Sequence, residues 1–165
     1  MIIRLDSESA VALRKLRAAV DADGALGSPA ERERALEHIE QLLQPPFDSI
    51  GAFISERLVG AATISRMPES PFDPDASNWY SLSAVIVHPC SRGQGIGKAL
   101  VQECLSQAAQ LNAAGILLEL NVPNPAAKAL YESFGFEPWN VRQAAYRHNG
   151  QRFDQVSMRK NLSKS

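Results

Sequence analysis

The fold is decided by one stretch of the sequence, Val85-Ile86-Val87-His88-Pro89-Cys90-Ser91-Arg92-Gly93-Gln94-Gly95-Ile96-Gly97-Lys98. It starts as a β-branched apolar run that ends at a proline, continues as a loop with three glycines in five residues, and leads into an amphipathic helix. Glycines tolerate positive φ angles and let a ligand come close to the backbone. Because this loop opens a helix, its backbone N–H groups form a cradle of the kind that binds pyrophosphate. The stretch therefore predicts an anion-binding site.

The composition is that of an ordinary globular protein. The 165 residues are 45% hydrophobic and 21% charged, and the formal net charge is −1. This balance lacks the positive charge typical of nucleic-acid-binding proteins. No continuous apolar run reaches about 18 residues and no signal-peptide pattern follows Met1, so we expect neither a membrane span nor secretion, and a cytoplasmic location. Two cysteines and three histidines do not match the spacing of a zinc site, and no metal is expected.

Hydrophobic periodicity and turn residues predict an alternation of strands and helices. The expected strands cover residues 2–5, 51–55, 58–66, 79–87, 116–122, 139–146 and 152–158. The expected helices cover residues 7–20, 29–43, 97–112 and 125–134. Residues 67–78, which hold three prolines and three acidic residues, are expected to form a long functional loop. Since no linker or repeat interrupts this order, one domain over residues 1–165 is predicted.

The glycine loop has three other interpretations. A Walker loop would need a glycine five residues before Gly97 and a hydroxyl residue after Lys98, where Arg92 and Ala99 stand instead. A dinucleotide fingerprint would need its third glycine at position 98, although Glu119 lies where a ribose-binding acid is expected. The glycines could also do no more than make a tight turn between a strand and a helix. The last two alternatives remain open.

Two groups of residues resemble the conserved segments of the GNAT superfamily of N-acetyltransferases. Arg92-x-x-Gly95-x-Gly97 resembles its acetyl-CoA signature, and Asn124, Leu130-Tyr131 and Gly135-Phe136 resemble its second conserved segment. The resemblance covers essentially the whole chain and is most specific in residues 79–136. It implies an α/β (α+β) fold in one domain, with a central mixed, mostly antiparallel sheet of about six or seven strands and about four helices.

The resemblance implies that acetyl-CoA is the cosubstrate. Its pyrophosphate would bind the segment Arg92, Gly93, Gln94, Gly95, Ile96, Gly97 and Lys98, mainly through backbone N–H groups and the helix dipole. Its pantetheine arm would pair with the backbone of Val85, Ile86 and Val87, as an added strand does. Asn124 resembles the residue that contacts the same arm, but a plain helix cap before Pro125 explains it as well.

Two side chains resemble the catalytic pair of this superfamily. Tyr131 matches the general acid that protonates the leaving thiolate, and its alternative is a ring packed in the core. Glu119 stands 12 residues before Tyr131, a spacing that resembles the ribosomal-protein N-terminal alanine acetyltransferases, where the matching glutamate is the general base. Because its strand is otherwise apolar, Glu119 is expected to be a buried carboxylate in need of a partner or a function. The alternative is a structural glutamate at an edge or in an ion pair.

The remaining candidates are better explained by structure. Cys90 and Cys104 lack a catalytic partner, and His88 is expected to be structural. Trp79, Tyr80 and Trp139 are expected to pack rather than to line an acceptor pocket. The predicted function is transfer of acetyl from acetyl-CoA to a primary amine of an unidentified small-molecule or peptide acceptor. The alternative is a CoA- or acyl-CoA-binding module without turnover. Members of the superfamily commonly form homodimers, but no interface is identified here.

Overall fold

The computed structural model describes residues 1–24, 37–68, 78–148 and 150–162. The chain divides into two compact units. Unit 1 comprises residues 1–65 and 84–105, and unit 2 comprises residues 66–83 and 106–165. The seven strands follow the sheet order β1-β2-β3-β4-β5-β7-β6. Since the division falls within β4, the expectation of a single domain remains a prediction, and each unit is described separately.

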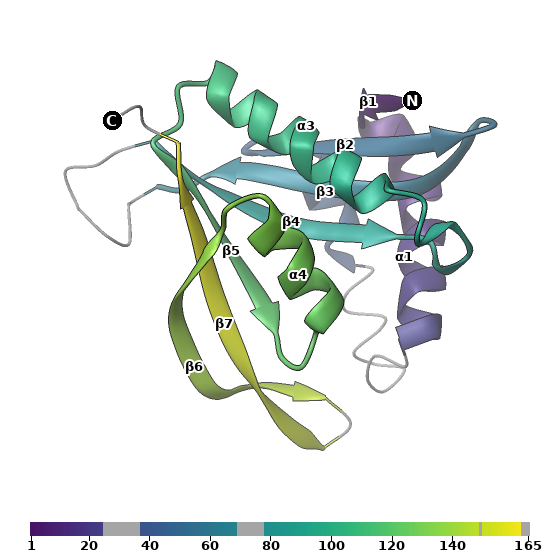
Figure 1. The fold of residues 1–165 in the computed structure, drawn as a ribbon. Coiled ribbons are helices and arrows are strands. Elements are labelled where there is room, and N and C mark those ends of the chain that lie inside the picture. The colour runs from purple at the N-terminus through teal and green to yellow at the C-terminus, as the bar shows by residue number, and fades with distance from the viewer. Residues whose placement is uncertain (25–36, 69–77, 149, 163–165) are drawn as a thin grey trace. The chain divides into compact units, whose positions relative to one another are not determined.

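Unit 1 begins with three antiparallel strands, β1 (Ile2–Arg4), β2 (Phe47–Ile54) and β3 (Arg57–Arg66). β2 and β3 are joined by a two-residue turn in which Ser55 and Glu56 have φ values of 46° and 65°. Two consecutive positive φ angles match the right-handed twist of the flanking strands, which is why this turn closes the hairpin. Figure 1 shows β2 and β3 side by side along most of their length.

Helix α1 (Ala10–Gly24) covers one face of this hairpin. It follows the 3-10 turn η1 (Ser7–Ser9), whose N-terminus is capped by the Asp6 carboxylate. A second 3-10 turn, η2 (Ile39–Leu43), packs beside α1. Their buried apolar side chains form one core cluster with β3, made of Leu5, Leu13, Leu16, Ile39, Leu58 and Ala61. This cluster fixes α1 on the strands, because an amphipathic helix is stabilised mainly by burial of its apolar face.

Strand β4 (Trp79–Val87), turn η3 (Pro89–Ser91) and helix α3 (Ile96–Gln110) form the strand-loop-helix segment expected from the sequence. The beginning of α3 packs close to β3 at Gly60. A Cβ at Gly60 would lie 2.8 Å from Ile96 Cγ2 and 2.9 Å from Leu100 Cδ1, so only glycine permits this approach. Since neighbouring residues of a strand face opposite sides, Gly60 meets α3 while Ala61 joins the α1 cluster.

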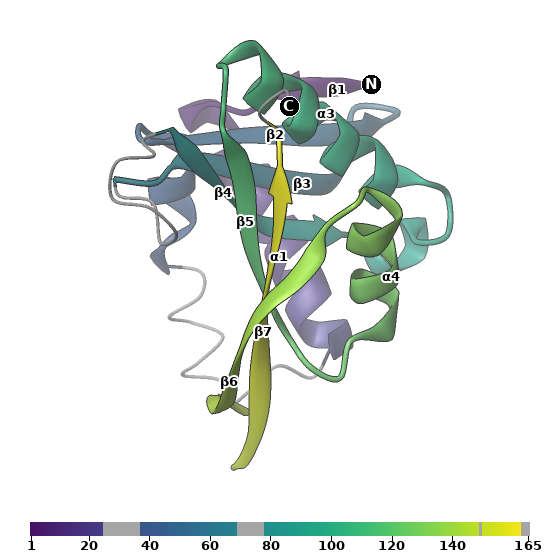
Figure 2. The ribbon, with the colours of Figure 1, turned by 60° about the vertical axis from the view of Figure 1, so that its left-hand side comes forward.

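Unit 2 contains β5 (Gly115–Asn121), α4 (Pro125–Ser133), β6 (Glu137–His148) and β7 (Gln151–Asn161). Residues 79–81 of β4 pair in parallel with residues 115–117 of β5, and β7 runs antiparallel to both β5 and β6. Figure 2 shows β6 and β7 as a long twisted hairpin. A bulge between Arg142 and Tyr146 includes Ala144, which has a φ of 50° and donates its N–H to the Asp154 carboxylate at 2.9 Å.

The predicted fold class is confirmed: seven strands form one mixed sheet that is mainly antiparallel. The described part of the chain holds three helices, α1, α3 and α4, where about four were expected for the whole chain. Residues 29–36 of the helix expected over 29–43 lie outside the described residues. The end of that range, Ile39–Leu43, forms the 3-10 turn η2. The predicted first helix ended too early, at residue 20, whereas α1 continues to Gly24.

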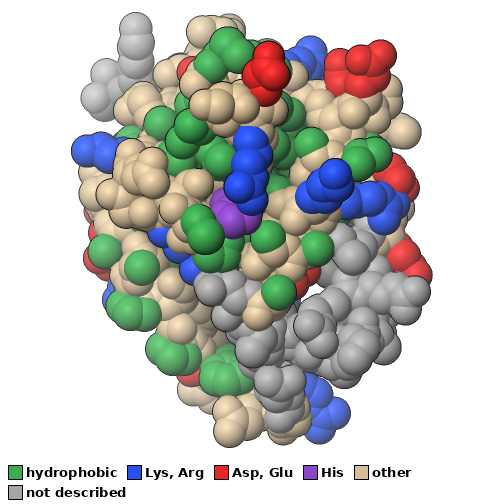
Figure 3. All heavy atoms as spheres, turned by 90° about the vertical axis from the view of Figure 1, so that its right-hand side faces the viewer, with side chains coloured by type: hydrophobic (Ala, Val, Ile, Leu, Met, Phe, Trp, Pro, Cys, Tyr) green, Lys and Arg blue, Asp and Glu red, His purple; other side chains and the backbone are tan. Residues whose placement is uncertain are grey.

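On the face seen in Figure 3, basic, acidic and hydrophobic side chains are interspersed, in keeping with the net charge of −1. Within the described residues, every helix is too short or too polar to cross a bilayer.

Candidate active site

The glycine loop of unit 1 is an open cradle at the start of α3. Gly93 and Gly95 have φ values of 75° and 78°, and a Cβ placed on either would have no heavy atom of another segment within 4 Å. These glycines are therefore required by their backbone conformation and not by packing. The carbonyl of Gly95 accepts the first α3 hydrogen bond, from Ala99 N–H at 3.0 Å. The N–H groups of the following three residues, 96–98, consequently have no partner within the helix and can bind an anion.

The side chains around the cradle are largely solvent-exposed. Arg92, Gln94 and Lys98 are exposed, and Ile96 and Gly97 are half-buried. Val85, Ile86 and Val87 precede the loop as a half-buried end of β4, and the Ile86 side chain packs against the α1 cluster. All ten cofactor-binding candidates of this segment thus lie in unit 1, on β4 and on the loop and first turn of α3.

His88 has the structural role expected for it. Its backbone N–H donates to the Val59 carbonyl at 2.7 Å, which holds the end of β4 against β3. Its Nδ1 accepts the Cys90 N–H at 3.2 Å and caps η3, while its Nε2 lies 2.9 Å from Arg57 Nη2. These contacts position the loop that leads into the cradle.

The two cysteines differ in environment. Cys90 is exposed, whereas Cys104 is a core residue of α3. Burial, with smaller contributions from the charges of Glu103 and Asp48, raises the pKa of the Cys104 thiol from 9.0 to about 12. At neutral pH the Cys104 sulfur therefore stays protonated, which agrees with an apolar packing role and not with a nucleophile.

Asn124 of unit 2 caps α4. Its side-chain oxygen accepts the Ala127 N–H at 3.2 Å, and Pro125 occupies the first helical position. The capping interpretation is therefore correct, and a ligand contact through the exposed remainder of the side chain stays a prediction.

Tyr131 lies on the buried side of α4. Tyr131 is 8% exposed, and its ring meets the Phe136 ring edge-on, with centroids 5.9 Å apart and planes at 68°. The helix ends here because the Tyr131 carbonyl accepts from Phe134 and Phe136 N–H groups at 3.0 and 3.1 Å, with Gly135 at a φ of 84°. The ring is thus held by core packing, which fixes the direction of its side chain without excluding a catalytic role for the phenol.

Glu119 corrects an expectation, since it is not buried. Its side chain is 47% exposed, and its Oε1 lies 3.2 Å from Arg142 Nη2. Arg142 also contacts the Gln155 side chain, whose Nε2 donates to Asn121 Oδ1 at 3.2 Å. A continuous apolar pattern predicts burial of both faces of this strand, but alternation turns Glu119 away from the buried Leu118 and Leu120. The ion pair considered as the alternative is present.

Two charged residues of unit 1 were missed by the sequence analysis. Asp21 is only 2% exposed, and Arg17 binds it from one helical turn earlier, with its Nε 2.9 Å from Oδ1 and 3.1 Å from Oδ2. The sequence does hold a signal for this pair, because Asp21 is eight residues after Leu13 and therefore lies on the apolar side of the helix. It was overlooked because the predicted helix ended at residue 20.

Comparisons with known proteins agree with this arrangement. The model of the Acetyltransferase (GNAT) family matches residues 15–136. N-alpha-acetyltransferase RimI of Mycobacterium tuberculosis is 35% identical over 111 residues, which are 67% of this chain and 65% of that protein. The ribosomal protein bS18-alanine N-acetyltransferase of Escherichia coli K12 is 33% identical over 78 residues, which are 47% of this chain and 53% of that protein. The chain thus matches between about half and two thirds of the length of these relatives.

The fold also matches solved structures. The structure of yncA from Salmonella typhimurium with its cofactor acetyl-CoA has a TM-score of 0.78 and 18% sequence identity, and the match covers 100% of this chain and 95% of that one. The family match extends over most of the chain and includes both the glycine cradle and Tyr131. The protein belongs to the GNAT family of acetyltransferases.

Proposed function

We propose that this protein transfers the acetyl group of acetyl-CoA to the α-amine at the N-terminus of a peptide or protein. The observation that carries the proposal is the cradle at Gly93 and Gly95, an open glycine loop followed by N–H groups that have no partner within α3. The choice of acceptor is supported by the two relatives named above, which are an N-alpha-acetyltransferase and an alanine N-acetyltransferase.

The residues of unit 1 fit the binding of acetyl-CoA. The N–H groups of residues 96–98, which have no partner within the helix, and the dipole of α3 suit a diphosphate, and Arg92 and Lys98 add positive charge at the exposed rim. The backbone of Val85, Ile86 and Val87 offers the pantetheine amides a strand to pair with. In unit 2, the exposed side chain of Asn124 is proposed to bind the same arm.

The chemistry requires two proton transfers. Bound acetyl-CoA supplies an acyl group activated as a thioester. The Glu119 carboxylate, directly or through a water molecule, removes the proton that the acceptor ammonium must lose before it can attack. The Tyr131 phenol donates a proton to the sulfur that leaves. Arg142 touches only Oε1 of Glu119 within the described residues, and this pairing holds the carboxylate in one orientation.

The proposed function is tested by product analysis. The full chain is incubated with acetyl-CoA and a peptide that begins with alanine and contains an internal lysine. We expect release of CoA and one acetyl group per peptide, located on the α-amine by fragmentation mass spectrometry. A peptide with a formylated N-terminus serves as the control and should stay unmodified. Acetylation of the lysine alone would contradict the proposed acceptor.

Binding of acetyl-CoA is measured separately from turnover. At about 100 times its dissociation constant, acetyl-CoA should stabilise the fold by about 2.7 kcal/mol, which raises the melting temperature by a few degrees, while NAD has no effect. Stabilisation without turnover for any amine would favour the binding module over the enzyme. Stabilisation by NAD alone would overturn the assignment of the cradle.

Replacement of Glu119 tests the base. Glu119→Gln keeps the size and loses the charge, so kcat/KM should fall by about 10²- to 10⁴-fold at neutral pH, and the limb of the pH–rate profile that reports the base should disappear. Glu132→Gln is the matched control, since Glu132 is 48% exposed and paired to Lys128, much as Glu119 is 47% exposed and paired to Arg142. An unchanged pH–rate profile in Glu119→Gln would remove this carboxylate from the mechanism.

A further inference from the structure

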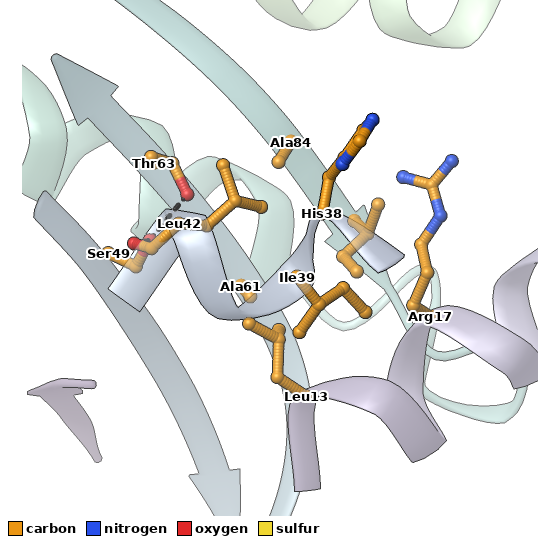
Figure 4. A pocket seen from close by; sticks show the side chains of 10 residues that line it. Leu13, Arg17, His38, Ile39, Leu42, Ser49, Ala61, Thr63 and Ala84 are labelled. Atoms are coloured by element: carbon orange, nitrogen blue, oxygen red, sulfur yellow. Dashed lines mark hydrogen bonds between the residues drawn. The ribbon is translucent and has the colours of Figure 1, made fainter. Parts of the chain in front are cut away.

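A small cavity in unit 1 lies beside the strand that is proposed to hold the pantetheine. It has a volume of about 80 Å³ and is enclosed by α1, η2 and strands β2, β3 and β4. Its walls are apolar and include Leu13, Ile39 and Ala61, as Figure 4 shows. Ala84 and Ile86 of β4 also line it, so its contents would lie next to the backbone that receives the acyl donor.

One end of the cavity is closed by two hydroxyl groups that satisfy each other. Ser49 Oγ lies 2.6 Å from Thr63 Oγ1 and donates to the Leu42 carbonyl at 2.6 Å. Both residues are 2% exposed. Since the Ser49 proton is used by the carbonyl, Thr63 donates to Ser49, and neither hydroxyl has a donor left for a ligand.

The opposite end is formed by two nitrogen-bearing side chains. In Figure 4 the Arg17 guanidinium and the His38 ring are both on the side of the view away from the Ser49–Thr63 pair. Arg17 is 27% exposed, and its Nε is held by Asp21. In the part of the chain that the structure describes, its two terminal nitrogens make no hydrogen bond. The four N–H groups on those nitrogens are therefore available in a planar fork.

The burial of Asp21 requires an explanation beyond stability. A buried carboxylate loses its hydration, and a buried ion pair is often no more stable than an apolar pair of the same size. Within the described residues, Asp21 Oδ1 also lacks a partner in hydrogen-bond geometry, although it contacts Arg17 Nε. The Asp21 carboxylate instead orients the Arg17 side chain. Because it binds Nε, the edge of the guanidinium that carries the two terminal nitrogens is left for another group beside the cavity.

Ala84 adds a second sign of function at the same place. It has a φ of 52° within a strand, a left-handed conformation that is strained for a residue other than glycine. Strained residues and strand irregularities concentrate at ligand sites because the surrounding structure has to hold them. Here the strained residue lines the wall of the cavity.

We infer that Arg17, positioned by Asp21, recognises a carboxylate of the acceptor, whose small apolar portion fills the cavity. The inference rests on the proposed function, because it names the class of amine that the enzyme selects. A guanidinium fork binds a carboxylate through two parallel, charge-assisted hydrogen bonds, which a carboxamide cannot reproduce. The carboxylate belongs to an acidic residue next to the N-terminal amine. A preference for a free amino acid is the other outcome of the test, and it would replace the peptide acceptor of the proposed function.

The test compares matched carboxylate and carboxamide probes. The peptides Ala-Asp-amide and Ala-Asn-amide form one pair, and L-alanine and L-alaninamide form the other. Their dissociation constants are measured by calorimetry on the full chain saturated with CoA, which cannot donate an acetyl group. We expect the carboxylate of at least one pair to bind about tenfold or more tightly, and the pair that shows the preference identifies the source of the carboxylate.

Variants attribute the preference to Arg17. In Arg17→Met the preference should fall to within about twofold, and Arg17→Lys should retain part of it. Asp21→Asn should weaken it by releasing the guanidinium. Arg14→Met is the matched control on the same helix, because Arg14 binds Glu40 away from the cavity, and it should leave the preference unchanged. Stabilisation by acetyl-CoA confirms that each variant is folded.

Three outcomes would overturn the inference: equal binding within both pairs, no binding of any probe, or a preference that persists in Arg17→Met. Failure of the proposed function looks different. In that case the protein still binds the carboxylate probe more tightly when CoA is present. With acetyl-CoA, however, it yields no acetylated product from any of the four probes or from the alanine peptide.

Discussion

The glycine cradle and the Glu119–Tyr131 pair perform two parts of one proposed reaction but are built in opposite ways. The cradle in unit 1 consists of backbone, and the space around Gly93 and Gly95 is open. The two side chains in unit 2 are defined by their neighbours, since Tyr131 packs on Phe136 and Glu119 pairs with Arg142. A ligand cradle can therefore be specified by a few consecutive residues, whereas a catalytic side chain depends on contacts brought from elsewhere in the chain.

This difference has a consequence for mutations. In the cradle, a change of backbone conformation should alter the affinity for acetyl-CoA and leave the rest of the fold intact. At Tyr131, the ring is part of the core, so only a change that preserves the ring separates chemistry from stability.

The largest effect is expected at Tyr131. Tyr131→Phe removes the phenol and keeps the edge-on contact with Phe136, so kcat should fall by about 10²- to 10⁴-fold with little change in stability. Steady-state kinetics and thermal unfolding measure the two quantities. Tyr80→Phe, on β4, is the control and should retain activity. A Tyr131→Phe enzyme with full turnover would reduce Tyr131 to a packing residue and erase the contrast with the cradle.

A smaller effect is expected at Gly95. At its φ of 78° an alanine is strained by roughly 1–2 kcal/mol, so Gly95→Ala should weaken acetyl-CoA binding by about 5- to 30-fold, as measured by calorimetry. Gly150 is a matched control in the β6–β7 turn, with a φ of 76° and equally open surroundings. Gly150→Ala should incur the same strain and keep its affinity for acetyl-CoA. Equal losses in both variants would show that the loop acts through stability and not as a cradle.

The smallest effect is expected behind the cradle, in the body of α3. Because the pKa of Cys104 rises from 9.0 to about 12 on folding, its contribution to stability is complete below pH 9 and is lost between pH 9 and 12. In that window the free energy of unfolding should fall with a slope of up to about 1.4 kcal/mol per pH unit from this group alone.

Urea unfolding at neutral and alkaline pH measures this slope. At neutral pH the free energy of unfolding of Cys104→Ala should be lower than that of the wild type, because the substitution leaves a cavity. Above pH 9 this free energy should fall less steeply than in the wild type. Cys90→Ala, at an exposed position, should follow the wild-type curve. Identical alkaline slopes in wild type and Cys104→Ala would mean that the thiol is not protected by the core of α3.

Much of the fold was predictable because its signals are local. Strand β4 has the predicted bounds, and α3, β5 and α4 begin within about a residue of the predicted positions, because proline, glycine and Asn124 mark their starts. The beginning of β2 at Phe47 was missed, since cross-strand pairing with β3 and not local pattern extends it back from Gly51. The prediction of a buried Glu119 failed because burial of one face of a strand says little about the other.

The sequence by itself determined the family resemblance, the order of the elements and the position of the glycine loop, because glycine placement and apolar periodicity act over a few consecutive residues. Only the tertiary structure decided that Arg142 holds Glu119, that Phe136 fixes the Tyr131 ring, and that Asp21 aims Arg17 beside a cavity. Burial and charge pairing depend on which segments meet in space. Arg142 is 23 residues from Glu119, and no local pattern encodes that distance.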